Sequence, residues 1–150
     1  MKRYLIAICI CFLIVTACGK QESVVDFELI ANETSIIALH IGGVDVNGAS
    51  TEETNITIEE ENKIKKVIAL LVGIDFVPIE KQDVLNQGLH KAIGYNLFFI
   101  EDFDSQEHPS LWLLSDGETI IIPTWGEQYF IIRDAANLHK QILNILEVQF

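Results

Sequence analysis

The carboxylates that could hold a metal ion are concentrated in one acidic stretch between two apolar runs. Glu101, Asp102, Asp104, Glu107 and His108 follow one another closely there. Carboxylate oxygens are the ligands that Ca²⁺ prefers, but the EF-hand spacing is absent, because neither its Gly nor its final Glu stands in the required place. We therefore interpret the stretch as a solvated hairpin loop. Cation binding by the acidic loop 101–107 remains an alternative function.

The four histidines of the chain do not add a metal motif. His40, His90, His108 and His139 show no ligand spacing of the HExxH kind. The pattern places His40 within a strand and His139 on the side of a helix that faces water. We therefore predict no metal-ligating residues.

Motifs for covalent catalysis are also missing from the sequence. It contains no G-x-S-x-G elbow and no S-x-x-K. Ser110 and Ser115 lie at strand ends, without a nearby His that the sequence could justify as a base. Gly42-Gly43 alone does not make a phosphate-binding loop. We therefore expect no catalytic residues, no cofactor and no enzymatic activity; an enzyme of unrecognised type is the second alternative.

The first twenty residues have the layout of a secretory leader. Lys2 and Arg3 are followed by a run that has no charged residue from Tyr4 to Thr16. The end of this run overlaps the segment Val15-Thr16-Ala17-Cys18. A basic start, a short apolar segment and small residues at a cleavage site are typical of a signal peptide. The apolar run is shorter than the roughly 20 residues that a spanning helix needs. We predict export with the basic end retained inside.

The segment Val15-Thr16-Ala17-Cys18 resembles the lipobox of bacterial lipoproteins. This resemblance implies that the Cys18 sulfur receives a diacylglycerol with palmitate-type chains, and that cleavage makes Cys18 the new N-terminus. Several acyl chains on one residue hold a protein stably at a membrane, whereas one chain binds only marginally. The predicted organisation is a signal peptide over 1–17, a tether over 18–34 and a single extracytoplasmic domain over 35–150, held at the cell membrane by lipid.

Charge and cysteine content restrict the partners of the exported part. The chain has a formal net charge of −12, and loss of Lys2 and Arg3 would make the mature form more acidic still. Nucleic-acid binding, which needs clustered Lys and Arg, is therefore not expected. Cys9 and Cys11 would leave with the leader, so that Cys18 is the last cysteine and no internal disulfide can form. The domain must be held together by its core.

Hydrophobic periodicity predicts one strand, one helix, four strands and a final helix. Ile36–Ile41 is a predicted strand, and Phe76–Ile79 is a short extended piece that Pro78 confines to a sheet edge. The first helix begins at Thr57 as N-cap, with Glu60 at the capping-box position, and ends at Gly73. Its predicted apolar stripe is Ile64, Val67, Ile68 and Leu71. Four further strands are predicted over 93–100, 111–114, 120–122 and 129–132, with a tight hairpin at Ser115-Asp116-Gly117. The stretch 81–91 cannot be assigned.

The last helix begins at Asp134 and carries Leu138, Ile142 and Ile145 on one stripe. The predicted fold is a two-layer α+β domain, an antiparallel sheet of about five strands with two amphipathic helices on one face. This arrangement resembles the small YhfM-like lipoproteins of Gram-positive bacteria. The resemblance assigns no activity and no site residues.

The predicted sheet has apolar side chains on both faces. Leu97 and Phe99 alternate with Phe98 and Ile100, and Leu111 and Leu113 alternate with Trp112 and Leu114. Because two helices cover only one face, the segment 24–30, a second subunit or a partner must cover the other. We predict a non-catalytic interaction module whose interaction face includes Phe98, Ile100, Trp112 and Leu114. The expected partner of this face is either an envelope protein or a second copy of the chain.

Overall fold

The computed structural model describes residues 36–44, 49–105, 108–124 and 126–149. The predicted signal peptide 1–17, the tether 18–34, Cys18 and the candidate covering segment 24–30 lie outside these residues. None of the helices in the described part is both long enough and apolar enough to cross a membrane.

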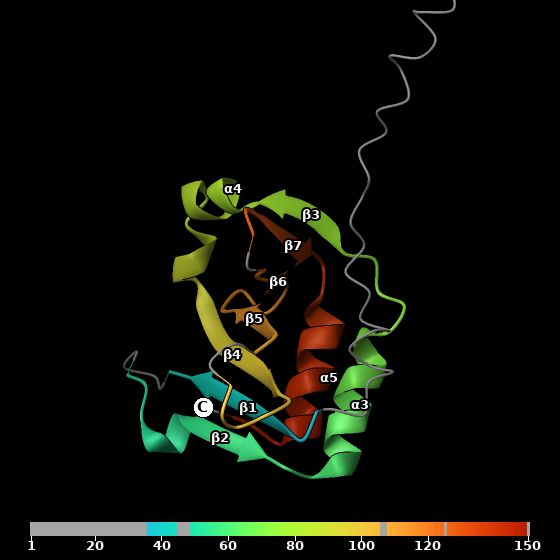
Figure 1. The fold of residues 1–150 in the computed structure, drawn as a ribbon. Coiled ribbons are helices and arrows are strands. Elements are labelled where there is room, and N and C mark those ends of the chain that lie inside the picture. The colour runs from blue at the N-terminus through green and yellow to red at the C-terminus, as the bar shows by residue number, and fades with distance from the viewer. Residues whose placement is uncertain (1–35, 45–48, 106–107, 125, 150) are drawn as a thin grey trace, which may run out of the picture.

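A seven-stranded antiparallel sheet forms the centre of the domain (Figure 1). The strand order is β2-β1-β4-β5-β6-β7-β3. The strands are β1 (Ala38–Gly43), β2 (Asn55–Ile58), β3 (Val77–Glu80), β4 (Ile93–Ile100), β5 (Ser110–Leu114), β6 (Ile120–Ile122) and β7 (Gln128–Ile132). The α+β class is as predicted, but the expectation of about five strands is wrong.

The two extra strands are short and lie at the two edges of the sheet. Thr57 was expected to cap a helix; instead Asn55–Ile58 forms β2, in which Thr57 pairs with His40 of β1. Val77–Glu80 forms β3 and pairs with β7. The prediction that Pro78 confines this piece to an edge is confirmed, because an edge strand can lose one backbone donor without breaking a ladder.

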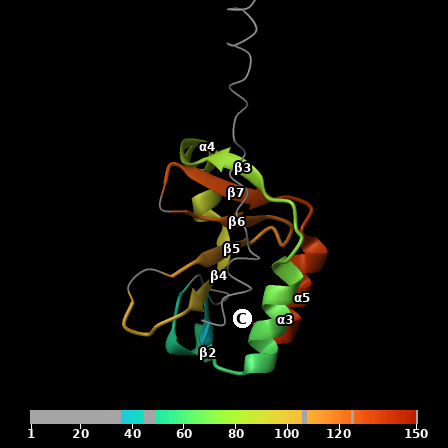
Figure 2. The same ribbon diagram turned by 45° about the vertical axis from the view of Figure 1, so that its right-hand side comes forward.

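Two helices pack on one face of the sheet (Figures 1 and 2). They are α3 (Glu61–Leu71) and α5 (Ala136–Leu146). The first predicted stripe is correct, since Ile64, Val67 and Leu71 are buried. The start was predicted too early: Glu60, not Thr57, is the N-cap, because β-pairing with β1 takes Thr57 into the sheet.

The main core lies between this sheet face and the two helices. Its largest fully buried side chains include Leu39, Leu97, Phe99, Leu111 and Leu113. Burying one such side chain contributes about 1.5–3 kcal/mol. The predicted alternation along β4 and β5 is confirmed, since these side chains face the helices while Phe98 and Trp112 do not belong to this core.

The final helix differs from its prediction in start and in orientation. Its N-cap is Ala135, and Asp134 has a positive φ of 56°. The buried stripe is His139, Ile142 and Leu146, so that His139 does not face water as predicted; it is only 8% exposed. The His139 ring lies edge-on to Tyr95 of β4, with centroids 6.2 Å apart. An amphipathic histidine can join an apolar stripe, which is why the pattern placed it wrongly.

The unassigned stretch 81–91 covers one end of the second sheet face. It forms α4 (Lys81–Asn86) and a 3₁₀ turn at Leu89–Lys91. Val84 of α4 is fully buried in a second, smaller core with Leu114, Ile121, Tyr129 and Ile131. The chain thus covers part of this face by itself, and the remainder of the face carries the candidate site.

Candidate functional site

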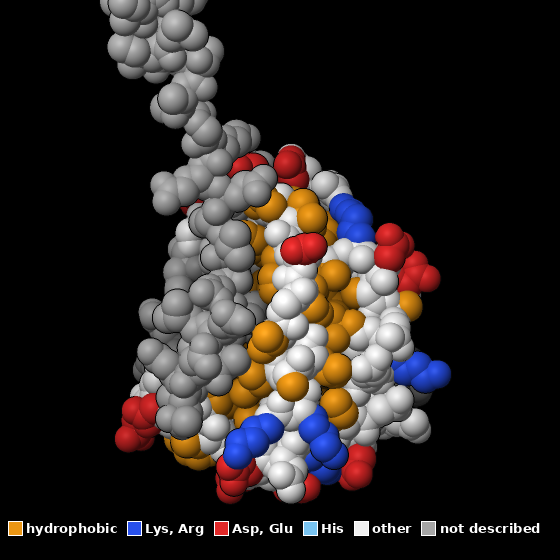
Figure 3. Space-filling model, turned by 90° about the vertical axis from the view of Figure 1, so that its right-hand side faces the viewer, with side chains coloured by type: hydrophobic (Ala, Val, Ile, Leu, Met, Phe, Trp, Pro, Cys, Tyr) orange, Lys and Arg blue, Asp and Glu red, His pale blue; other side chains and the backbone are white. Residues whose placement is uncertain are grey.

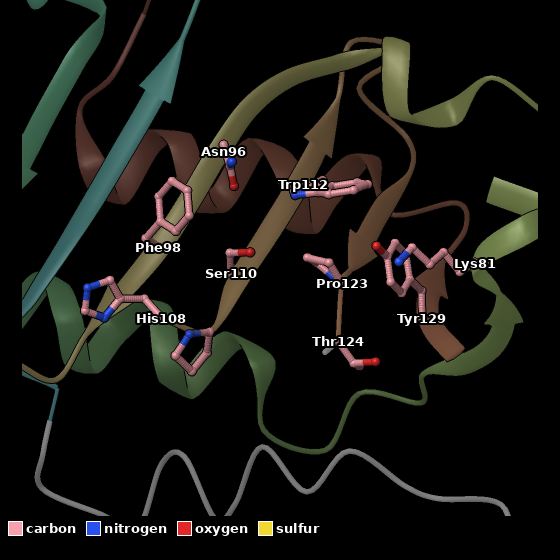
Figure 4. A pocket seen from close by; sticks show the side chains of 10 residues that line it. Lys81, Asn96, Phe98, His108, Ser110, Trp112, Pro123, Thr124 and Tyr129 are labelled. Carbon is pink, nitrogen blue, oxygen red and sulfur yellow. The ribbon is translucent and has the colours of Figure 1, made fainter. Parts of the chain in front are cut away.

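A hollow of about 420 Å³ lies on the second sheet face, beside the part that α4 covers (Figure 4). We call it the sheet hollow. Its lining comes from β4, β5, β7, the start of α4 and the segments next to β5 and β6. The lining residues are Lys81, Asn96, Phe98, His108, Pro109, Ser110, Trp112, Pro123, Thr124 and Tyr129.

Side-chain size along one row of the sheet explains why the face is hollowed. Phe98 of β4 pairs with Ser110 of β5, so both point to this face. Strand β6 ends at Ile122, and Pro123 follows before the row reaches Tyr129 of β7. Ser110, which is 8% exposed, is therefore a small residue in a row that has Phe98 on one side and Pro123, then Tyr129, on the other. It forms the floor of the sheet hollow.

Aromatic rings form the walls of the sheet hollow. Trp112 and Tyr129 meet edge to face, with ring centroids 5.7 Å apart and planes at 88°. Phe98 stands on the opposite side, and its ring centroid is 6.2 Å from that of His40. Large, partly exposed rings around a concave site are typical of ligand pockets.

Two polar atoms at the sheet hollow have no hydrogen-bond partner among the described residues. These are Oδ1 of Asn96 and Nδ1 of His108, and both atoms are removed from solvent. A buried polar atom without a partner costs about 1–3 kcal/mol. In native proteins such atoms are nearly always paired with protein, water or a bound molecule. Asn96 and His108 therefore line the sheet hollow with hydrogen-bonding capacity that the described residues do not use.

The charge at the sheet hollow differs from that of the whole chain. Among the described residues, its lining includes Lys81 and no carboxylate, although the chain has 22 Asp and Glu against 10 Lys and Arg. The backbone N–H of Lys81 donates to the Glu127 carbonyl at 2.7 Å, which fixes the start of α4 against the β6–β7 loop. No ion pair joins the Lys81 side chain to another described residue. The site thus provides a positive charge that is not neutralised locally.

The predicted interaction residues lie at different depths on this face. Phe98 and Trp112 line the sheet hollow. Ile100 is 7% exposed and Leu114 is 1% exposed, with Leu114 packed in the second core beneath α4. Phe98 and Trp112 are therefore available to a ligand, whereas Leu114 supports the site from below.

Of the residues that line the sheet hollow, the sequence analysis named Phe98 and Trp112 as interaction residues and missed the others, including Lys81, Asn96 and Tyr129. Lys81 was in the unassigned stretch, Asn96 is a polar residue within an apolar strand, and Tyr129 was read only as part of a strand. Asn96 could have been noticed, because a polar residue on the same strand face as Phe98 has to find a partner.

The acidic loop does not assemble a metal centre within the described residues. No group of three or more His, Cys, Asp or Glu side chains is placed there to hold a metal ion. Asp102 Oδ1 instead accepts the backbone N–H of Asp104 at 3.0 Å. Glu107 lies outside the described residues, and His108 turns to the sheet hollow. His40 pairs through Nδ1 with the Thr57 hydroxyl at 3.0 Å.

His139 lies at a second, more open hollow of about 430 Å³, on the helical side of the sheet. Burial lowers the pKa of His139, while a backbone hydrogen bond at Leu114 and the charge of Asp116 oppose this shift. Its Nε2 atom has no partner among the described residues. This environment favours the neutral ring, which fits a residue of the helix–sheet core.

Apolar side chains also gather on the side of the molecule that carries α3 (Figure 3). Val72 and Val77 are 39% and 59% exposed. A small hollow of about 230 Å³ adjoins Val77, and its lining includes both Asp75 and Arg133. With charges of both signs and an aliphatic floor, this surface indicates no particular ligand chemistry.

Comparison of the chain with protein-family models, with curated proteins and with solved structures finds no match.

Proposed function

We propose that this chain is a bacterial lipoprotein, held by lipid on Cys18 at the extracytoplasmic face of the cell membrane, and that its domain binds a ligand in the sheet hollow. The single observation that carries the binding role is the sheet hollow itself. It lies on the sheet face that the sequence pattern left uncovered, with Phe98 and Trp112 in its walls.

The size and lining of the sheet hollow support a ligand of small-molecule dimensions. Its volume of about 420 Å³ falls within the range of roughly 300–1,000 Å³ that is usual for ligand sites. Such sites combine apolar walls with a few polar groups that fix orientation. Here Phe98, Trp112 and Tyr129 are the walls, and Asn96, His108 and Lys81 are the polar groups.

The described lining of the sheet hollow contains no activated nucleophile, which favours binding without catalysis. Ser110 and His108 both line the sheet hollow, but Nδ1 of His108 has no hydrogen-bond partner among the described residues. A serine nucleophile needs a base within hydrogen-bond reach and a third group that orients the base. The interaction module expected from the sequence is thus refined here to a ligand-binding module.

The lipid anchor rests on the leader and its lipobox-like end, Val15-Thr16-Ala17-Cys18. Anchoring through acyl chains needs no spanning helix, since each buried methylene contributes about 0.8 kcal/mol. The tether would hold an acidic domain near the membrane surface without requiring the domain itself to bind lipid.

A fluorescence titration tests the binding role. Trp125→Phe leaves Trp112 as the last tryptophan of the chain. The full chain, purified in detergent, is titrated with four classes of probe: neutral sugars, cyclic carboxylates, cyclic amines and short basic peptides. A saturable change in Trp112 emission with at least one class is expected. No change with any of the four classes would contradict the proposed function.

A further inference from the structure

The charge balance of the sheet hollow restricts the ligand further. Lys81 is its one lysine or arginine among the described lining residues, and no carboxylate stands beside it there. Figure 4 shows the Lys81 side chain beside the Tyr129 ring, at the end of the hollow opposite His108 and Phe98. Lys81 is a partly exposed residue, and its ammonium, which no ion pair with another described residue neutralises, gains from an anionic group that completes the pair.

One positive charge matches one negative charge. A doubly charged phosphate would find a single lysine or arginine, Lys81, among the described lining residues, within a chain whose net charge of −12 repels anions at long range. A single carboxylate avoids this mismatch, because its charge is balanced by a single ammonium at short distance. Cyclic amines and basic peptides are disfavoured by Lys81 for the same electrostatic reason.

The aromatic walls of the sheet hollow indicate the shape of the part of the ligand that carries no charge. Trp112 and Tyr129 stand perpendicular to each other at 88°, and Phe98 lies across the Ser110 floor. This arrangement receives a flat, compact body that packs against aromatic surface. The side chains of Asn96 and His108, whose Oδ1 and Nδ1 atoms lack partners among the described residues, line the same hollow and can turn these atoms toward substituents on that body.

We propose that the sheet hollow binds a six-membered ring that carries one carboxylate, with the ring between Phe98 and Trp112 and the carboxylate toward Lys81. This inference rests on the proposed binding function and names its ligand class. The same chemistry occurs in sugar acids and in aromatic acids, and the test below separates these two sources.

The test compares matched charged and neutral probes by Trp112 emission in the Trp125→Phe chain. Glucuronate is compared with glucose, and benzoate with benzyl alcohol. In at least one pair, the carboxylate should bind about tenfold or more tightly than its neutral counterpart, a difference of about 1.4 kcal/mol, because its bond to the ammonium is charge-assisted. Preference in the first pair identifies a sugar acid, and preference in the second pair an aromatic acid.

Lys81→Gln should remove this preference, and Lys81→Arg should retain most of it. Lys66→Gln is the matched control, because Lys66 is an exposed residue of α3 on the other side of the sheet and its substitution changes the net charge equally. The melting temperature of each variant verifies folding, and Lys81→Met, which also removes the charge, replaces Lys81→Gln if that variant is unfolded.

Any of three results would overturn the inference. The charged and neutral probes could bind with equal affinity, the preference could be unchanged in Lys81→Gln, or neither carboxylate could bind. The proposed binding function would survive these outcomes if neutral sugars, amines or peptides changed the Trp112 emission. The proposed binding function fails only if none of the four probe classes changes the Trp112 emission. Failure of the binding function is therefore distinguishable from failure of the carboxylate inference.

Discussion

Trp112 of β5 and Tyr129 of β7 meet edge to face across the intervening strand β6, with ring centroids 5.7 Å apart and planes at 88°. Tyr129 belongs to the second core beneath α4, and Trp112 packs against that core from its rim. The pair therefore separates the part of the sheet face that α4 covers from the part that stays open as the sheet hollow.

Trp112→Ala should destabilise the domain and remove one wall of the sheet hollow. Burial of a large ring and an edge-to-face contact are both lost. Because Trp112 is only partly buried, we expect a decrease in the free energy of unfolding of about 2 kcal/mol, less than the 3–5 kcal/mol of fully buried aromatic residues. Urea denaturation measures the change. Trp112→Phe, which keeps a ring, should lose less; equal losses for both variants would contradict the role of the ring contact.

Asp116→Ala should weaken the hairpin between β5 and β6. Asp116 Oδ1 accepts the backbone N–H groups of Glu118 and Thr119, each at 2.8 Å, and Thr119 is 6% exposed. Loss of the acceptor leaves these donors unpaired, at a cost of about 1–2 kcal/mol in the free energy of unfolding. Asp116→Asn keeps an acceptor oxygen and should lose less. A decrease below about 0.3 kcal/mol in Asp116→Ala would show that the turn does not depend on these bonds.

The free energy of unfolding should decrease below neutral pH through His139. Burial lowers its pKa in the folded chain from an ordinary value of 6.5, although the charge of Asp116 in the β5–β6 hairpin opposes this. Between the lowered pKa and 6.5, the unfolded chain binds more protons. The free energy of unfolding that neutral His139 contributes is therefore fully present above the pKa of His139 in the unfolded chain. It is lost as the pH falls toward the lower pKa of His139 in the folded chain.

Urea denaturation at several values between about pH 5 and about pH 7.5 checks this dependence. The comparison is with His139→Phe, which keeps an aromatic ring beside Tyr95 and cannot titrate; Lys140, which lines the same hollow, is present in both chains. The difference between the two stabilities should change with pH in this range. A constant difference would contradict the lowered pKa of His139.

Cys18→Ser should release the chain from the membrane. Serine cannot carry a thioether-linked lipid, and without acyl chains the remaining apolar segment is too short to span a bilayer. Cell fractionation should find the original chain in the membrane pellet, with an acylated Cys18 by mass spectrometry. Cys11→Ser is the control and should stay in the pellet. Equally firm membrane retention of the mature Cys18→Ser chain would refute the lipid anchor.

Periodicity predicted the elements whose apolar stripes are uninterrupted. The stripe through Ile64, Val67 and Leu71 and the alternation of Leu97 with Phe98 are both seen in the structure. The pattern failed where a pairing partner distant in sequence decides the outcome. Thr57 is a good helix cap in isolation, but the register with His40 draws it into a strand.

The sheet hollow could be predicted only in part, for the same reason. Phe98 and Trp112 were placed on one face by alternation alone. The depth of the site depends on small Ser110 beside Phe98 and on the end of β6 before Tyr129, and its charge depends on Lys81 at the start of α4. Sheet register and helix placement bring these residues together, and neither is encoded in local spacing.

Filling the sheet hollow from its floor is the sharpest test of whether a ligand binds there. Ser110→Leu should place an aliphatic side chain between Phe98 and Tyr129 with no loss of melting temperature, because the space above Ser110 is open to receive it. Ser115→Leu adds the same group at an exposed position of the next hairpin. In the Trp125→Phe background, the ligand-induced change in Trp112 emission should disappear in Ser110→Leu and persist in Ser115→Leu. An undiminished emission change in folded Ser110→Leu would contradict ligand binding in the sheet hollow.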